Sequence, residues 1–129
     1  MKKIKLKIAF KDRRGKIIDL IENEKINAVT LITIKKGAIR GNHYHKKTWQ
    51  WNYVISGKMR LVTKIPNKKI KTILLNPGDL ALTLPGELHA LVGVKDCECL
   101  VFTKGPRSGR EYESDTFRLE KPIVELLGK

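Results

Sequence analysis

The segment GAIRGNHYHKKTWQWNYVISG, residues 37–57, decides the fold expected for this 129-residue chain. It places two of the chain's three histidines, His43 and His45, one residue apart, and Gln50 follows five residues later. Successive side chains of a strand point to opposite faces, so an H-x-H pair projects both imidazoles to one side. A turn at 46–48 would let the next strand bring the Gln50 amide back to the same space. The segment therefore predicts a polar cluster inside a β-structure.

Short runs of alternating apolar and polar residues recur on both sides of this segment, separated by turns rich in Gly, Pro and Asn. This rhythm is typical of an all-β sandwich or barrel. No long segment has helical periodicity, and the best helical candidate is the short run IVELL at 123–127. No linker or repeat is visible, so we expect one domain over residues 1–129. The expected strands are 2–10, 16–21, 28–35, 43–46, 49–55, 58–65, 69–75, 79–84, 88–94 and 98–103.

The third histidine, His89, begins another expected strand directly after a PGE turn. A lone histidine is more often a hydrogen-bonded structural residue than a ligand, so His89 by itself indicates little. Three neutral imidazoles and an amide oxygen gathered inside a barrel would, however, suit a divalent transition metal such as Zn, Fe, Ni, Mn or Co. The metal ligands considered are His43, His45, Gln50 and His89.

The spacing of these residues resembles the first motif of the cupin superfamily. That motif consists of a glycine, five residues, HxH, three or four residues, Glu, six residues and a second glycine. One substitution stands out, because Gln50 occupies the position where the family usually has Glu. A neutral amide leaves more positive charge on a metal and binds it more loosely than a carboxylate does. The residues that fall on the motif are Gly37, His43, His45, Gln50 and Gly57.

Residues 78–93 resemble the second cupin motif, with the spacing from Gly78 to His89 retained. Leu84 and Gly93 stand where the family usually has Pro and Asn. Two motifs in register imply a single-domain cupin, which is a double-stranded β-helix or jelly-roll barrel.

A closer resemblance concerns the strings GAIRGNHYHKKTWQ and FKDRRGKIIDLIE. Both are similar to motifs of the RmlC-like cupins of polysaccharide biosynthesis, the dTDP-4-dehydrorhamnose epimerases and the dTDP-4-keto-6-deoxyhexose ketoisomerases. The resemblance implies His43 as catalytic base, His45 as a second catalytic histidine and Arg40 as a substrate-binding residue. We expect Asn52, which shares the strand face of Gln50, to contact substrate as well.

The implied chemistry is coherent. A neutral histidine can remove the acidic proton beside a sugar ketone, and return of a proton to another face or carbon gives epimerisation or ketoisomerisation. Arg40 offers a bidentate fork for a diphosphate, the alternative being an ordinary surface arginine. The sugar-nucleotide relatives work without a metal and generally lack the imidazole of His89. Whether His43 is a base or a ligand stays open, because coordination would occupy the lone pair that a base needs.

Two other functional classes remain as alternatives. The first is a non-catalytic cupin that binds a small ligand or a partner protein in the same pocket. The second is a metal-dependent cupin enzyme of another class. Oxygenase chemistry is disfavoured within that class, because it usually requires a carboxylate ligand. Glu87 would supply one only if the PGE turn directed it inward.

The charge balance is strongly basic, with 27 Lys and Arg against 13 Asp and Glu, a formal net charge of +14. Such a charge favours polyanionic partners, including nucleotides. The lysines mostly alternate with apolar residues, and no nucleic-acid-binding motif accompanies them, so nucleic acid is disfavoured as a partner. No apolar stretch approaches the ~20 residues of a membrane span, and the N-terminus lacks the apolar run of a signal peptide. We therefore expect a cytoplasmic protein.

Three large aromatic residues, Trp49, Trp51 and Tyr53, share the strand face opposite Gln50. Our favoured interpretation is a homodimer interface, and the alternative is coverage by the chain's own N-terminal strand. Tyr44 should point away from the histidines.

The charged run KGPRSGREYESDTF, residues 104–117, is expected at the surface over a pocket mouth. The spacing of its polar residues assigns them no role, although four could reach a ligand: Arg107, Arg110, Tyr112 and Asp115. Cys97 and Cys99 are expected as reduced core residues, with a minor metal or redox role left open.

Overall fold

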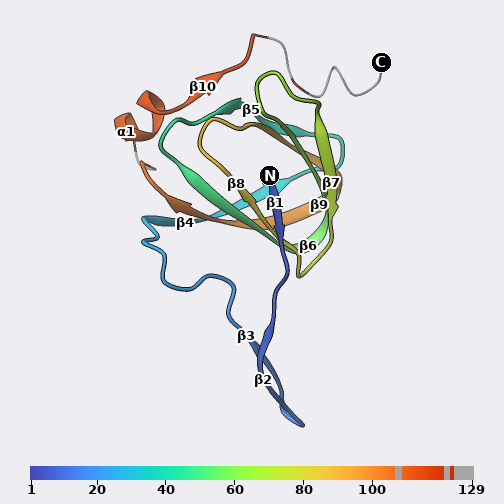
Figure 1. Cartoon of the computed structure of the whole chain (residues 1–129). Coiled ribbons are helices and arrows are strands. Elements are labelled where there is room, and N and C mark those ends of the chain that lie inside the picture. The colour runs from blue at the N-terminus through green and yellow to red at the C-terminus, as the bar shows by residue number, and fades with distance from the viewer. Residues whose placement is uncertain (107–108, 121–122, 124–129) are drawn as a thin grey trace.

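The computed structural model describes residues 1–106, 109–120 and 123 (Figure 1). Strands dominate this part of the chain, which confirms the all-β class. Residues 124–127 of the helix expected at 123–127 lie outside the described residues. The elements are β1 (Lys2–Ile4), β2 (Ile8–Asp12), β3 (Gly15–Ile18), β4 (Ala28–Ile34), β5 (Ile39–Tyr44), β6 (Trp49–Lys64), β7 (Lys71–Leu75), β8 (Leu80–Thr83), β9 (Leu88–Lys104), α1 (Gly109–Ser114) and β10 (Phe117–Arg118).

Two long antiparallel strands, β6 and β9, organise the fold. They pair from Trp49 with Lys104 to Lys64 with Leu88. The first half of β6 also pairs with β8, which pairs with β1, and the second half of β9 pairs with β4. The second half of β6 pairs with β7. The first half of β9 pairs with β5, which in turn pairs with β10. The strands therefore wrap around a common interior (Figure 1).

The continuity of β6 and β9 corrects the expectation of four separate strands in these regions. The gaps at 56–57 and 95–97 were expected to separate these strands, but the ladder only shifts register between Val54 and Met59. Gly57 lies within this bend at φ +79°, and a Cβ there would overlap the carbonyl oxygen of Asp96. A glycine at this position therefore lets two backbones cross closely without breaking either strand.

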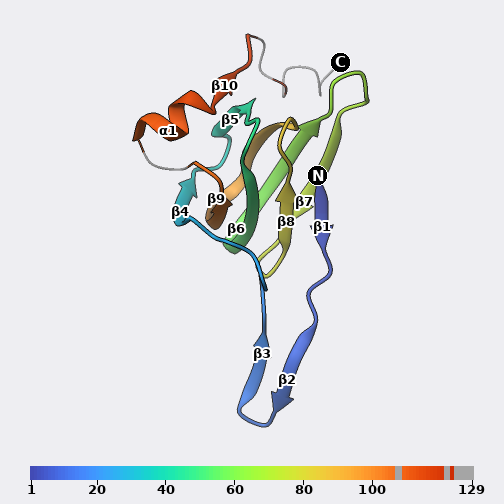
Figure 2. The same ribbon diagram turned by 60° about the vertical axis from the view of Figure 1, so that its left-hand side comes forward.

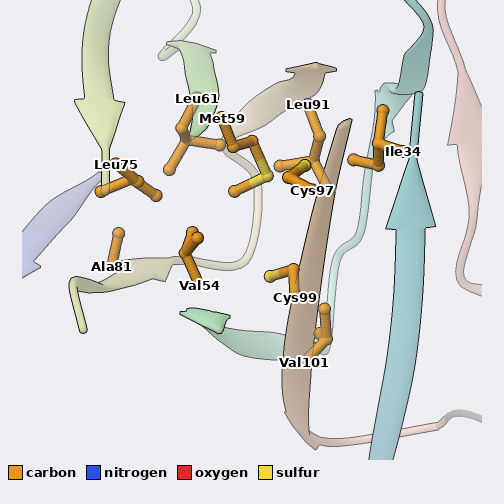
Figure 3. Close-up of a cluster of buried hydrophobic side chains, with 10 residues drawn as sticks. All are labelled: Ile34, Val54, Met59, Leu61, Leu75, Ala81, Leu91, Cys97, Cys99 and Val101. Atoms are coloured by element: carbon orange, nitrogen blue, oxygen red, sulfur yellow. The ribbon is translucent and has the colours of Figure 1, made fainter. Parts of the chain in front are cut away.

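The apolar core lies beside this bend (Figure 3). Alternate residues of β9, namely Cys97, Cys99 and Val101, point into it together with Met59 and Leu61 of β6. Both cysteines are free and buried, as expected. Burial raises the pKa of the Cys99 thiol to about 12, so it behaves as a small apolar side chain.

The aromatic face of β6 is covered largely by the chain itself. Trp51 is buried and packs in a cluster with Leu82, Leu6 and Ile21, and the half-buried Tyr53 packs against the same cluster. The alternative interpretation, coverage by N-terminal segments, therefore applies to these two residues. The homodimer stays a prediction.

The hairpin of β2 and β3 forms a separate two-stranded sheet that projects from the rest of the molecule (Figure 2). Its apolar side chains Ile8, Phe10 and Ile17 are each more than half exposed. Across the described residues, no helix has the length and apolar character needed to cross a membrane.

Candidate active site

The three histidines of the chain meet in the interior. His43 lies on β5 and His89 on β9, and the two residues are direct partners in the ladder. His45 follows the end of β5, and its ring centroid lies 4.7 Å from that of His43 and 5.4 Å from that of His89. One nitrogen from each ring falls within 4.8 Å of the others. The expected convergence of the three imidazoles is therefore confirmed.

A bulge in β5 makes this arrangement possible. Register shifts between Gly41 and His43, and the residue between them, Asn42, has a φ of +57°. A Cβ on Gly41 would lie 3.0 Å from the carbonyl oxygen of His89, so the glycine permits the close approach of β5 to β9. The Asn42 side chain also accepts a hydrogen bond from the Ile123 N–H at 3.1 Å. The extra residue in β5 thus places His43 directly opposite His89.

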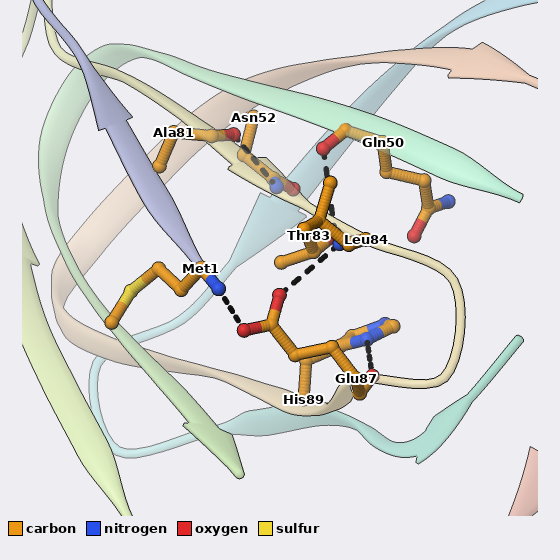
Figure 4. A network of polar contacts seen from close by, with 8 residues as sticks. All are labelled: Met1, Gln50, Asn52, Ala81, Thr83, Leu84, Glu87 and His89. Carbon is orange, nitrogen blue, oxygen red and sulfur yellow. Dashed lines mark hydrogen bonds and ion pairs between the residues drawn. The ribbon is translucent and has the colours of Figure 1, made fainter. Parts of the chain in front are cut away.

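A cavity of about 390 Å³ opens beside the histidines. Gln50 and Asn52 of β6 line it as expected from strand alternation, and His43, His89 and Arg40 line it from β5 and β9. The Asn52 amide donates a hydrogen bond to the Ala81 carbonyl at 3.3 Å, which fixes its orientation (Figure 4). Five of the six residues expected at the site therefore border a single space, and the sixth, His45, lies beside it without lining it.

Backbone carbonyls determine which ring nitrogens carry protons in two of the histidines. His45 Nδ1 lies 2.9 Å from the Asp115 carbonyl, and His89 Nδ1 lies 3.2 Å from the Glu87 carbonyl (Figure 4 shows the second contact). A carbonyl only accepts hydrogen bonds, so each Nδ1 is the donor. The lone pair of each neutral ring is then on Nε2.

Burial keeps the imidazoles of His43 and His89 neutral. It lowers the pKa of His43 to about 4, with further lowering by the charges of His45 and Arg118. It lowers the pKa of His89 well below its ordinary value, again assisted by the other two histidines. Neutral rings are required both for a general base and for metal ligands.

Glu87 does not join the histidines. Its carboxylate forms an ion pair with the Met1 amino group and accepts a hydrogen bond from the Leu84 N–H at 3.1 Å (Figure 4). Within the described ranges, the cluster of metal-capable side chains consists of the three histidines alone. The inward Glu87 that an oxygenase site would need is therefore not found.

Arg40 is exposed at the rim, where its Nε donates to the Thr33 carbonyl at 3.2 Å. Arg40 takes part in none of the ion pairs found among the described residues. Tyr44 stacks on Phe117 at 5.1 Å between ring centroids and does not line the cavity, as expected.

The segment after β9 lies beside the site, as expected, but the sequence did not indicate which residues its side chains would contact. Tyr112 of α1 lines the cavity, and its ring centroid is 5.4 Å from that of His45. The Asp115 carboxylate instead binds the turn at 46–48. Arg110 is exposed, and Arg107 lies outside the described residues. No local spacing in the sequence signals these contacts, because they join residues about seventy positions apart.

Burial alone would raise the pKa of the Asp115 carboxyl. The hydrogen bonds donated by Thr48 and by the N–H groups of Lys46 and Lys47 outweigh burial, and the net shift is downward. The carboxylate is therefore ionised at neutral pH, and its hydrogen bonds are charge-assisted.

Comparisons with known proteins agree with this geometry. The family model described as "Polysaccharide biosynthesis C-terminal domain" matches residues 10–95. Oxalate decarboxylase OxdC of Bacillus subtilis (strain 168) is 33% identical over 78 residues, which is 60% of this chain and 20% of that protein. The chain thus spans about a fifth of the length of this curated relative.

Two solved structures are similar over most of the chain. A double mutant of the 3,4-ketoisomerase QdtA from Thermoanaerobacterium thermosaccharolyticum, in complex with TDP, is 27% identical with a TM-score of 0.72, covering 92% of this chain and 86% of that one. The rmlC epimerase of Mycobacterium tuberculosis is 13% identical with a TM-score of 0.73, covering 91% and 67%. The second likeness concerns the fold alone. Together they confirm the RmlC-like cupin resemblance and the jelly-roll fold.

Proposed function

Because the chain belongs to the polysaccharide biosynthesis C-terminal domain family, we propose that it is an isomerase or epimerase acting on a keto sugar carried by a nucleoside diphosphate. One observation carries the proposal. Three imidazoles lie together, and two of them, His43 and His89, are kept neutral by burial and line a cavity, in a chain that is 27% identical, over 92% of its length, to a ketoisomerase bound to TDP. The cavity volume of about 390 Å³ falls within the range of roughly 300–1,000 Å³ that is usual for small-molecule sites.

We assign His43 as the base that removes the proton next to the sugar ketone. Its lowered pKa, about 4, keeps the lone pair available over the physiological range. The imidazolium formed by proton transfer lies in the field of Glu113, whose charge acts to raise the pKa of His43. Return of the proton to the former carbonyl carbon, with a hydroxyl proton passing between the two oxygens, gives ketoisomerisation, whereas delivery of a proton to the opposite face by a second acid gives epimerisation. His89, with its lone pair on Nε2 at the cavity wall, would accept a hydrogen bond from a sugar hydroxyl, and His45 beside it would help to relay the proton.

Arg40 and Asn52 are proposed to hold the substrate. The guanidinium of Arg40 at the rim suits the diphosphate, which carries negative charge and accepts paired hydrogen bonds. The Asn52 amide lies deeper and offers an oxygen acceptor for a sugar hydroxyl. The net charge of +14 would attract such a dianionic substrate from a distance.

The same residues also fit a divalent metal, by the chemistry of the donor set. His43, His45 and His89 would hold it, with Gln50 nearby on the cavity wall, and the Nδ1 hydrogen bonds of His45 and His89 are typical of metal-binding imidazoles. A bound metal would stabilise negative charge developing on a substrate oxygen. The identity of the metal is not determined by these ligands.

The catalytic proposal is tested by incubating the full chain with TDP-4-keto-6-deoxyglucose in deuterated water and following the sugar by ¹H NMR. We expect exchange of a ring proton next to the ketone and a rearranged product. His43→Asn should reduce both by at least ~100-fold, since a positioned general base typically contributes 10²- to 10⁴-fold. Tyr44→Phe, between the histidines but directed away from the cavity, should retain the activity of the native chain.

Native protein that binds TDP but catalyses neither exchange nor rearrangement would contradict the enzyme proposal and support the non-catalytic ligand-binding alternative. The metal question has a separate test. Elemental analysis of protein purified without chelator, beside His89→Ala, should show stoichiometric metal in the native chain and its loss in the variant if the histidines coordinate. Metal-free native protein would instead support the acid–base assignment.

Three expectations from the sequence accompany this proposal as predictions. They are one cupin domain over residues 1–129, a homodimer, and a cytoplasmic location. Size-exclusion chromatography with light scattering addresses the homodimer directly.

A further inference from the structure

We propose that Asp115 is a positioning residue that fixes the tautomer and orientation of His45 through two separate contacts. The inference deepens the proposed function, on which its catalytic consequence rests. Asp115 follows the end of α1 and is 4% exposed, and neither its side chain nor its backbone lines the cavity. It therefore acts on the site through His45 and not through a ligand.

The first contact is with the imidazole itself. The Asp115 carbonyl oxygen accepts a hydrogen bond from His45 Nδ1 at 2.9 Å, and His45 is 2% exposed. In water the neutral histidine ring favours the proton on Nε2. A buried carbonyl aimed at Nδ1 reverses that preference, because the other tautomer would leave a lone pair facing the carbonyl oxygen. The lone pair of His45 is thereby held on Nε2.

The second contact is with the backbone that follows His45. The Asp115 carboxylate accepts hydrogen bonds from the N–H of Lys46 at 3.0 Å, from the N–H of Lys47 at 3.1 and 3.2 Å, and from Thr48 Oγ1 at 2.7 Å. Thr48 is buried as well. One ionised side chain thus holds the whole turn between His45 and β6, and charge-assisted hydrogen bonds of this kind are the stronger ones.

Asp115 is itself held in place. Its N–H donates to the Tyr112 carbonyl at 3.1 Å, and Thr116 Oγ1 donates to the same carbonyl at 2.7 Å. Immediately beyond, β10 pairs with β5, so Phe117 lies opposite Tyr44 and Arg118 opposite His43. The carbonyl that orients His45 is therefore fixed on both sides, by the end of α1 and by the strand that carries His43.

The arrangement has a functional consequence. Loss of the carboxylate would release the turn and α1 together, and the imidazole of His45 would return to the tautomer favoured in water. Residues that orient a functional histidine in this way typically contribute roughly 10- to 100-fold to activity or metal affinity. The expected effect is on turnover, since Asp115 makes no contact with the cavity that would hold substrate.

The test is the tautomer of His45, read from two-bond ¹H–¹⁵N correlations of the ¹⁵N-histidine-labelled full chain at neutral pH. We expect the Nδ1–H form in the native chain and a shift toward Nε2–H in Asp115→Ala. Asp115→Asn retains an amide oxygen for the two N–H groups and should keep most of the native signal. Ser114→Ala, on the exposed adjacent residue, serves as the matched control and should leave the signal unchanged.

Activity on the keto sugar provides the second measurement. Asp115→Ala should lower kcat by roughly 10- to 100-fold with KM changed much less, and Asp115→Asn should restore most of the loss. If Asp115→Ala does not fold, Thr48→Val, which removes one donor to the carboxylate and preserves side-chain volume, should give a smaller change in the same direction.

The tautomer requires no substrate, so this inference and the proposed function fail separately. A native His45 in the Nε2–H form would overturn the inference even in an active enzyme. So would a folded Asp115→Ala whose His45 signal matches the native one. A chain inactive on keto sugars, with the expected tautomer shift, would retain the positioning role and refute the isomerase.

Discussion

The interior of this protein has two ends, built from the same two strands but very different in character. Near the bend of β6 and β9, side chains such as Met59, Leu61 and Cys99 are completely buried and contact one another. Toward the other end, buried His45 and His89 bond to backbone carbonyls, and His89 borders a cavity. The change from core to site reflects both the type of side chain that points inward and the bulge in β5 that brings His43 opposite His89.

The two ends should differ in what they contribute to stability. Burying a large aliphatic side chain stabilises a fold by about 1.5–3 kcal/mol. A buried neutral hydrogen bond contributes only about 0.5–1.5 kcal/mol net, since both partners lose water. We therefore expect the apolar end to hold the fold together and the histidine end to carry function at little gain in stability.

The largest expected effect is the loss of a side chain at the apolar end. Leu61→Ala should lower the free energy of unfolding by about 3 kcal/mol, because Leu61 is fully buried and the cavity left behind cannot collapse completely. His43→Asn, at the half-buried other end, should cost less than about 1 kcal/mol. Urea unfolding followed by circular dichroism measures both. Equal losses in the two variants would contradict the division between the ends.

The bend that separates the two ends should be nearly as sensitive. Gly57→Ala should cost at least about 2 kcal/mol, because the residue has positive φ and the added methyl would overlap the Asp96 carbonyl. Thermal unfolding provides the measurement. Gly37→Ala is the matched control, since its φ of +83° is similar but nothing lies within 4 Å of the added Cβ. Both variants introduce the backbone strain of positive φ, so the difference between their losses of stability measures the steric overlap at Gly57 alone. Equal losses would show that the two backbones are not in close contact there.

A smaller effect of opposite sign is expected at Thr103, which pairs with Gln50 near the polar end. Its Oγ1 is buried, and no hydrogen-bond partner for it occurs among the residues that the structure describes. Thr103→Val replaces the hydroxyl with a methyl of similar size, so stability should stay the same or rise by up to about 1 kcal/mol. A loss above about 1 kcal/mol on chemical denaturation would indicate that the hydroxyl is hydrogen-bonded in solution.

The smallest effect concerns the thiols of the apolar end. Burial raises the pKa of Cys97 and raises that of Cys99 to about 12, so neither forms appreciable thiolate at neutral pH. Iodoacetamide should leave the native protein unmodified on a timescale over which the urea-unfolded chain is alkylated twice. Mass spectrometry counts the adducts, and rapid labelling of the native chain would mean that this end opens readily.

Local rules predicted much of this structure. Strand alternation placed the imidazoles of His43 and His45 and the amide of Gln50 on the interior side. Motif spacing marked Gly57, where only a glycine fits the crossing of two backbones. These features depend on neighbours in the chain, and so a sequence pattern records them.

Features that depend on distant partners were not predicted. The bond between His45 and the Asp115 carbonyl joins residues 70 positions apart, and the ion pair of Glu87 with the Met1 amino group joins residues 86 positions apart. A backbone carbonyl carries no residue-type signal, and the spacing of the charged tail assigned no partner to Asp115. The coverage of Trp51 by Leu6 and Ile21 depends on the path of the N-terminal segment, and the sequence indicated it only as the alternative to a homodimer interface.

The length of the β6–β9 ladder has a consequence for how the chain folds. Lys64 pairs with Leu88, but Trp49 pairs with Lys104, so the pairs become progressively more distant in sequence. Closing a longer loop costs more entropy, so we expect the ladder to form first at the Lys64–Leu88 end and then to extend toward Trp49 and Lys104. Strand β5 would pair with β9 only after β9 has joined the ladder. The three imidazoles would then assemble among the last contacts, and a refolding chain would gain its chemistry only after its framework is complete.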